Sequence, residues 1–376
     1  MSRHYLDHAS TSPARPEVVE AMLPWLSGEG AADPGRVHTE GRMARAAIEE
    51  AREQVGALLG ARPREVVFTS GATEAVNAAV WGAAQHRPGA SVVCAAIEHS
   101  AVRDASRRHA PVIEPPVDGC GRIRTEAVIE LDPSHLALLH CQWGNHEVGT
   151  IQPAGELVAW ARQHGVLSHV DAAAAAGHVV VDHGALGADL LSVSAHKLGG
   201  PKGVGALVVR RGLRLAPFVV GGEQERARRG GMENVPAIVG FGAAAASLTA
   251  DGGRLLQSEA AQARVGTERL SAALTATEGV RGYGDAGHRL PHIVCIGVDG
   301  VEAEAVLLGL DQAGIAAHSG SACSSESLEP SPVLEAMGVD AERSLRLSVG
   351  WSTTAADIEA CVAALPRVVE RLRALR

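Results

Sequence analysis

The chain of 376 residues is long enough for two domains, and its content of 46% apolar and 20% charged residues is typical of a globular protein. A net charge of −9, without a dense Lys/Arg stripe, argues against nucleic-acid binding. No apolar run approaches the roughly 18 residues that span a bilayer, and no signal-peptide pattern opens the chain. The six cysteines form no CxxC pair. We therefore expect a cytoplasmic protein with reduced thiols, without membrane association and without a metal site.

Helical and strand patterns alternate from about residue 40 to 210, which predicts an α/β domain with a mainly parallel sheet. A helix is expected over Val37–Gly60, because apolar residues recur there at helical spacing and Gly60 can end it. Further helices are expected over Thr73–Ala84, Glu98–His109 and Pro153–His164. Short apolar strands are expected over Glu65–Thr69, Ser91–Ala95, Leu136–Cys141, Val166–Asp171, Leu190–Ser194 and Val204–Arg210.

The rest of the chain predicts a second, smaller domain. An Arg/Gly-rich segment, Gly221–Gly231, precedes an Ala-rich stretch that reaches about residue 275 and links the two parts. The expected order of the second domain is β-α-β-β-α, over His292–Val298, Val301–Gln312, Ile315–His318, Ser344–Val349 and a final amphipathic helix. We expect a large domain over residues 12–255 and a small domain over residues 256–376, to which residues 1–11 also belong.

Lysine is almost absent from the chain. Lys197 and Lys202 are the only two, against 32 arginines, and both stand in the stretch Ser194-Ala-His-Lys-Leu-Gly-Gly-Pro-Lys. Lysine can lose its proton, act as a base and form a Schiff base, whereas arginine stays protonated. A coding bias that left two lysines by chance is the alternative. The pattern therefore indicates that carbonyl chemistry, if the protein has any, is carried by this stretch.

The stretch Phe68-Thr-Ser-Gly-Ala-Thr-Glu runs from an expected strand into the start of a helix. Its small residues let the backbone approach an anion, to which a helix N-terminus presents unpaired N–H groups. Thr73 can add a hydroxyl. The stretch is not a Walker loop, because the GK[ST] ending is missing. An anion site and an ordinary capped turn both remain open.

Two expected strands end in polar residues at the sheet edge where α/β proteins place ligands. Asp171 could hold the protonated nitrogen of a pyridoxal ring, or it could cap a helix. His99 could stack on a ring or shuttle a proton, or it could be a structural histidine.

Two residues of the second domain also suit a site. Cys323 lies in a Gly/Ser loop, where a mobile thiol could visit a substrate and then a partner. An incidental exposed cysteine is the alternative, although exposed free thiols are a liability. Arg346 is a cation inside an apolar strand, so its burial requires a partner such as a substrate carboxylate held bidentately.

Taken in order, these segments resemble the class V, fold-type-I pyridoxal-phosphate enzymes, specifically cysteine desulfurases of the NifS/IscS type. The resemblance runs through nearly the whole chain, over residues 5–13, 68–77, 97–99, 145–149, 169–171, 194–197, 221–226, 319–323 and 345–348. It implies the fold-type-I architecture, in which a large domain with a mainly parallel sheet precedes a smaller α+β C-terminal domain.

The resemblance also implies a reaction: L-cysteine becomes L-alanine with pyridoxal 5′-phosphate as cofactor. Lys197 would hold the cofactor as a Schiff base and move the Cα proton, and Arg346 would bind the cysteine carboxylate. Cys323 would take the sulfur as a persulfide and pass it to an acceptor, which is expected to be a protein. Enzymes of this family are usually homodimers. The remaining cofactor contacts would come from Ala72, Thr73, Ser194 and His196 at the phosphate, and from Asp171 and His99 at the ring.

Three positions depart from the family pattern. His146 stands where asparagine is usual, and Ala174 stands where a glutamine usually contacts the phenolic oxygen of the cofactor. Met232 stands where a threonine usually reaches the phosphate in the partner subunit. Each change removes or replaces a hydrogen bond to the cofactor, and His146 could supply a new one to the phenolic oxygen.

Two other functions remain open. A related β-eliminating lyase or selenocysteine lyase of a specialised pathway would use the altered pocket for another substrate and would not need Cys323. A non-catalytic sulfur-relay or binding partner would explain the changes at Ala174 and Met232. Against it, Lys197 and Asp171 are both present.

Overall fold

The computed structural model describes residues 3–27, 32–319 and 330–375. Its largest element is a seven-stranded sheet in the order β2-β8-β7-β6-β5-β3-β4. β8 runs antiparallel to both of its neighbours, and the pairs from β7 to β4 are parallel, so the expected mainly parallel sheet is confirmed. The strands are β2 (Val66–Thr69), β3 (Ser91–Val93), β4 (Val112–Ile113), β5 (Leu136–Gln142), β6 (Leu167–Asp171), β7 (Leu190–Ser194) and β8 (Gly205–Val209).

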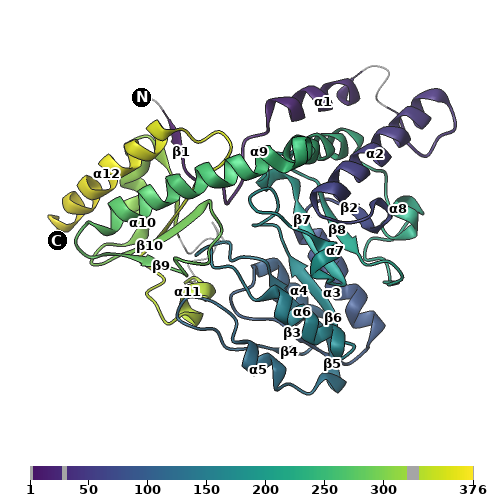
Figure 1. Cartoon of the computed structure of the whole chain (residues 1–376), viewed down its shortest axis with the longest axis horizontal. Helices are drawn as coiled ribbons and strands as arrows, with labels where there is room; N and C mark the ends of the chain where they lie inside the picture. The colour runs from purple at the N-terminus through teal and green to yellow at the C-terminus, as the bar shows by residue number, and fades with distance from the viewer. Residues whose placement is uncertain (1–2, 28–31, 320–329, 376) are drawn as a thin grey trace.

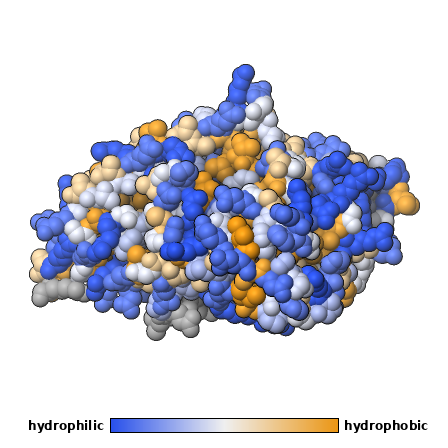
Figure 2. All heavy atoms as spheres, turned by 60° about the horizontal axis from the view of Figure 1, so that its bottom comes forward, coloured by the Kyte–Doolittle hydropathy of each residue, from blue (hydrophilic) through white to orange (hydrophobic). Residues whose placement is uncertain are grey.

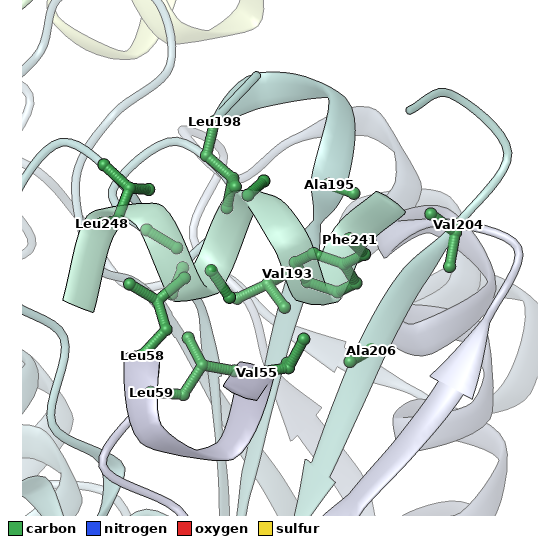
Figure 3. Packing of buried hydrophobic residues seen from close by; sticks show 14 of the residues in the cluster. Val55, Leu58, Leu59, Val193, Ala195, Leu198, Val204, Ala206, Phe241 and Leu248 are labelled. Carbon is green, nitrogen blue, oxygen red and sulfur yellow. The ribbon is translucent and has the colours of Figure 1, made fainter. Parts of the chain in front are cut away.

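Helices cover both faces of this sheet (Figure 1). On one face, α3 (Ala72–His86) and α4 (Ser100–His109) bury apolar side chains against Leu138 and Leu190. On the other face, α2 (Thr39–Leu58) and α9 (Val235–Thr275) pack against Val193 and Ala206, as Figure 3 shows. The other elements of this part are α1 (Pro16–Leu26), η2 (Pro63–Glu65), α5 (Thr125–Ile129), η3 (Pro133–His135), α6 (Ala154–Gln163), α7 (His183–Leu186), η4 (Ala195–Lys197) and α8 (Gln224–Ala227).

The Ala-rich stretch expected as a link is the long helix α9, which runs from the large sheet to the second sheet (Figure 1). Its backbone leaves helical geometry at residues 250–253, where Asp251, Gly252 and Gly253 have positive φ. By length and composition alone, α9 could span a membrane, because one 18-residue window has a mean hydropathy of 1.2. Half of that window, however, is buried inside the protein. The helix packs on α1 and α2, as the core helix of a globular protein does. On the face drawn in Figure 2, hydrophobic residues form separate patches among hydrophilic ones.

The second sheet is antiparallel, in the order β12-β13-β10-β9, and carries the C-terminal helices. The expected β-α-β-β-α order is correct except in three places, one of which is a short helix over Pro332–Ala336 that was not predicted. The strand β9 was not predicted, because its four residues include a glycine and only one buried side chain. The predicted strand Ile315–His318 is two strands, since β11 pairs with β1 and β12 pairs with β13. The elements are β1 (His4–Tyr5), β9 (Val280–Tyr283), β10 (Ile293–Val298), α10 (Ala303–Gln312), β11 (Ile315–Ala316), β12 (His318–Ser319), α11 (Pro332–Ala336), β13 (Ser344–Ser348) and α12 (Ala355–Arg373).

A buried ion pair ties α2 to the segment around α8. The Arg52 and Glu225 side chains are each 1% exposed, and the Arg52 guanidinium donates to both Glu225 carboxylate oxygens at 2.6 and 2.7 Å. The Phe68 backbone N–H donates to the same carboxylate at 2.9 Å. Glu225 and the two residues after it have φ of 49°, 60° and 60°, which is unfavourable for residues with a side chain. The ion pair therefore holds a strained segment in place.

Replacing Glu225 with glutamine should lower the free energy of unfolding by about 3–5 kcal/mol, because the buried Arg52 would lose its buried counter-charge and keep only the partly exposed Glu49 at 3.3 Å. Urea denaturation measures the loss. The matched control is Glu359→Gln, since Glu359 makes a similar bidentate pair with Arg269 but both side chains are more than half exposed. The control should change little. An equal loss of free energy of unfolding in both variants would contradict the stabilising role given to the buried Arg52–Glu225 pair.

Candidate active site

A cavity of about 510 Å³ opens where β5, β6 and β7 end, between the large sheet and β13. All the site residues that the sequence predicted and the structure describes lie on this cavity, although they come from distant parts of the chain. They are Ala72, Thr73, His99, His146, Asp171, Ser194, His196, Lys197 and Arg346. Cys323 lies outside the described residues. Four further residues that line the cavity were not predicted from the sequence, namely Ser10, Thr11, Gln142 and Gly203.

One end of the cavity is suited to an anion. Helix α3 begins there after Gly71 without a side-chain cap, so the first N–H groups of the helix are available to a ligand. A Cβ at Gly205 would lie 2.8 Å from the Gly71 carbonyl carbon, so a glycine is needed for this close approach of β8. Ser70, Ser194 and His196 border the same cavity. These features favour the anion site over the ordinary capped turn.

The His196 ring is neutral in this arrangement. Burial, together with the nearby charge of Lys197, lowers its pKa to about 4. The ring Nδ1 lies 3.1 Å from the hydroxyl of Thr11, a residue of the N-terminal segment. His196 can therefore act as a neutral hydrogen-bonding group beside an anion.

Asp171 ends β6 and faces the cavity. Its Oδ1 accepts hydrogen bonds from the Ser192 hydroxyl at 2.9 Å and from the Ala173 backbone N–H at 3.0 Å. The helix-cap alternative is wrong, because Asp171 precedes a turn and α7 begins only at His183. Within the described residues these hydrogen bonds engage Oδ1, so Oδ2 is suited to holding a protonated ring nitrogen.

A second carboxyl group, Glu98, is completely buried beside Asp171, and sequence analysis did not predict its role. Its Oε1 accepts the Gln142 backbone N–H at 2.7 Å. Burial, together with the negative charge of Asp171, raises the pKa of Glu98 to about 8. Glu98 is therefore protonated at neutral pH.

His99 precedes α4, and its Nδ1 accepts the Ala101 backbone N–H at 3.1 Å. The sequence had predicted that this helix begins at Glu98. It begins at Ser100 instead, because the His99 side chain caps it. Burial lowers the pKa of His99 to about 3, with smaller contributions from His146 and Lys197. A neutral ring whose Nδ1 accepts carries its proton on Nε2. His99 thus has a structural role as a cap, and its roles toward a cofactor ring stay predictions.

The three departures from the family pattern lie in different surroundings. His146 lines the cavity, and its ring packs edge-to-face on His99 with centroids 5.1 Å apart. Burial lowers the pKa of His146 to about 3, so this ring is also neutral. Ala174 lines the cavity with a methyl group only. Met232 is 66% exposed and borders a separate, smaller cavity of about 180 Å³.

Lys197 belongs to the short helix η4 that follows β7. Its backbone carbonyl oxygen lies 3.1 Å from His178 Nε2 and accepts the Ser12 hydroxyl at 3.3 Å. Lys202 also lines the cavity, but it is an exposed residue in the turn after Pro201. The two lysines therefore reach one site, and Lys197 is the one with a firmly held backbone.

Arg346 is 3% exposed and already has partners in the protein. Its Nη1 donates to the His146 carbonyl oxygen at 2.9 Å. Its Nη2 donates to Asp7 Oδ1 at 3.0 Å and to Ser10 Oγ at 2.6 Å. The partner that the sequence required is thus Asp7 in this structure, and the substrate carboxylate stays a prediction. Asp7 stands in the family-like N-terminal segment, but no local pattern pointed to its contact with Arg346.

The described cysteines are unsuited to attack a substrate. Cys94, Cys141, Cys295 and Cys361 are buried, and burial raises the pKa of the Cys361 thiol to about 12. Cys120 is less buried, and its pKa is also raised by desolvation. None of these five lines the cavity formed by the described residues. Cys323 therefore stays the predicted nucleophile.

Known proteins resemble this chain along nearly its whole length. The model of the family "Aminotransferase class-V" matches residues 4–361. "Cysteine desulfurase IscS 1" of Archaeoglobus fulgidus is 40% identical over 99% of this chain and 98% of its own length. "Putative cysteine desulfurase IscS 1" of Bacillus subtilis is 39% identical over 99% of this chain and 100% of its own length.

Solved structures agree with these relatives. A NifS-like protein from Rickettsia africae superposes with a TM-score of 0.89 at 28% identity, covering 98% of this chain and 99% of its own. The apo structure of a cysteine desulfurase from Thermococcus onnurineus has a TM-score of 0.88 at 25% identity, covering 98% of this chain and 95% of its own. The expected fold-type-I architecture is confirmed by these likenesses.

Proposed function

This chain belongs to the aminotransferase class V family, and we propose that it is a cysteine desulfurase, which converts L-cysteine into L-alanine and passes the sulfur on. Relatives with that name share about 40% identity with it along nearly its whole length. The observation that carries the proposal is one cavity that joins Lys197, Asp171, the uncapped start of α3 and the buried cation of Arg346. These groups suit an amino acid bound beside an anionic, ring-containing cofactor.

The cofactor of the proposal is pyridoxal 5′-phosphate, which the family uses in general. The uncapped start of α3 suits its phosphate, and Asp171 Oδ2 suits its ring nitrogen. Lys197 is the amine to which it would be joined. Bound there, the cofactor draws electrons away from the substrate Cα.

Each of the chain's own residues has a separate role in the proposed reaction. Arg346 holds the substrate carboxylate, and the Lys197 amine takes the Cα proton and returns one to the product. The Cys323 thiolate attacks the substrate sulfur, so that an S–S bond forms and the C–S bond breaks. The electron pair of the C–S bond goes to the substrate carbon, which is protonated to give alanine. The neutral rings of His99 and His146 place hydrogen-bonding groups beside the reacting atoms without adding positive charge.

The proposal also covers the setting of the enzyme. It acts as a cytoplasmic homodimer and hands its persulfide sulfur to a protein acceptor, without nucleic acid or membrane. The large domain comprises residues 12–255, and the small domain comprises residues 256–376 together with residues 1–11. The division is supported by the seven-stranded and four-stranded sheets, whose strands lie on either side of the break in α9 along the sequence.

The function is tested by giving the cofactor-loaded protein L-cysteine and a thiol reductant, and by measuring the products. We expect L-alanine and sulfide in equal amounts. Pyruvate and ammonia in place of alanine would indicate a β-eliminating lyase. Preference for L-selenocysteine would indicate a selenocysteine lyase. A protein that stays colourless with added pyridoxal phosphate would support the non-catalytic alternative.

Restoring the usual family residues should tighten cofactor binding. The double variant Ala174→Gln, Met232→Thr regains two polar contacts, each worth roughly 0.5–1.5 kcal/mol. We expect a dissociation constant for pyridoxal phosphate lower by about one to two decades, measured by equilibrium dialysis. The control Ala355→Gln makes the same change at an exposed position on α12 and should leave the constant unaltered. Unchanged or weaker binding in the double variant would contradict the prediction.

A further inference from the structure

Arg346 is placed in the middle of the second sheet, where its charge has to be balanced. It lies on β13 between Cys295 of β10 and His318 of β12, and it is 3% exposed. Asp7 balances it, at a nitrogen–oxygen distance of 3.0 Å. The Asp7 side chain is 18% exposed, so this ion pair is largely removed from water. A pair of this kind is strong and is costly to break by removing one partner.

Asp7 is held in this position by its neighbours along the chain. Two hydrogen bonds hold the backbone around it on β13. The Ser348 N–H donates to the Leu6 carbonyl oxygen at 2.8 Å, and the Ala9 N–H donates to the Ser348 hydroxyl oxygen at 2.8 Å. The Ser10 hydroxyl donates to Asp7 Oδ1 at 2.9 Å. Asp7, Ser10 and Arg346 thus form a closed triangle of hydrogen bonds at the cavity wall.

The triangle leaves few N–H groups of Arg346 for a ligand. Nη2 is committed to Asp7 and Ser10, and one N–H of Nη1 is committed to the His146 carbonyl. Nε is buried and has no hydrogen-bond partner among the described residues. A guanidinium binds a carboxylate bidentately through Nη2 together with either Nε or Nη1. A bidentate substrate carboxylate must therefore share Nη2 with Asp7 or displace it.

We propose that Asp7 sets the affinity and selectivity of the site for the substrate carboxylate, by occupying Arg346 until a substrate competes for it. The inference rests on the proposed function, because it takes Arg346 as the carboxylate-binding residue. Two carboxylates on one guanidinium repel each other, so the charge of Asp7 weakens carboxylate binding. Asp7 is a positioning residue that acts through Arg346, and it keeps the buried cation compensated when no substrate is bound.

The test is Asp7→Asn, which keeps an oxygen acceptor for Nη2 and removes the negative charge. The cofactor-loaded protein is titrated with L-alanine, which carries the carboxylate but no sulfur, and with ethylamine, which has no carboxylate. Both are followed by the visible absorbance of the cofactor. We expect Asp7→Asn to bind L-alanine about tenfold more tightly, a typical coupling between two sites. Ethylamine binding should be unchanged, and the KM for L-cysteine should fall while kcat is kept.

The matched control is Asp311→Asn, since Asp311 pairs with Arg3 at the exposed surface of the same part of the molecule. It should alter neither titration. A second variant, Ser10→Ala, frees one N–H of Nη2 without removing the counter-charge, and it should tighten L-alanine binding by a smaller factor. If Asp7→Asn does not fold, L-alanine binding by Ser10→Ala tests the proposal instead.

The outcomes separate this inference from the proposed function. Equal or weaker L-alanine binding in folded Asp7→Asn, with normal alanine production by the wild type, overturns the role of Asp7 alone. It would mean that Asp7 only orients Arg346. A wild-type protein that binds L-alanine no better than ethylamine overturns both the role of Asp7 and the assignment of Arg346.

Discussion

Replacing Lys197 with arginine should lower the turnover of L-cysteine by about three orders of magnitude or more, because arginine keeps its proton and cannot act as the base. The same substitution at Lys202 should leave turnover nearly unchanged. Both lysines line one cavity, so the pair forms a matched comparison within a single site. Only Lys197 belongs to η4, the short helix that follows β7, and only its carbonyl oxygen accepts the Ser12 hydroxyl among the described residues.

Cofactor attachment gives a second readout for the two lysines. Borohydride reduction of the cofactor-loaded protein, followed by peptide mapping, should place the pyridoxyl mass on Lys197. The Lys202→Arg variant should give the same map. A pyridoxyl group on Lys202, or on neither lysine, would refute the assignment.

Replacing Cys323 with serine should abolish alanine release while cofactor binding is kept. A hydroxyl is a poor nucleophile toward sulfur and cannot store it as a persulfide. The substrate should still bind through Arg346, so L-cysteine should still change the visible absorbance of the variant. The matched control is Cys120→Ser, since Cys120 is the least buried of the cysteines in the described part of the chain. It should retain turnover.

Alanine release at the wild-type rate by Cys323→Ser would contradict the persulfide mechanism and favour the lyase alternative. Loss of turnover in both cysteine variants would indicate a general effect of removing a thiol. The position of Cys323 lies outside the described residues, so this prediction rests on its sequence motif and on the burial of the other thiols.

The sequence predicted the parts of the fold that local patterns determine. Short strands such as Leu190–Ser194 were placed correctly, because a strand buried on both faces is made mainly of apolar residues. Asp171 and His99 were predicted because they follow expected strands, and parallel strands bring their ends to one edge. Lys197 was predicted because lysine is almost absent from the chain.

The contacts that the sequence did not predict depend on long-range register. Asp7 and Arg346 are 339 residues apart and meet only because the chain around Leu6 is bonded to β13. Glu98 becomes a neutral acid only because β5 and β6 bury it beside Asp171. The start of α4 was misplaced by two residues, since the His99 ring replaces the usual small polar cap. Local sequence patterns do not predict such contacts between distant residues.

The most direct test of the central claim is mass spectrometry of the cofactor-loaded protein after it has reacted with L-cysteine in the absence of reductant. If the chain is a cysteine desulfurase, the peptide that contains Cys323 should gain the mass of one sulfur atom, and one L-alanine should appear for each sulfur gained. The added mass should disappear on treatment with a thiol reductant. A Cys323 peptide of unchanged mass, in a protein that still consumes L-cysteine, would contradict the account.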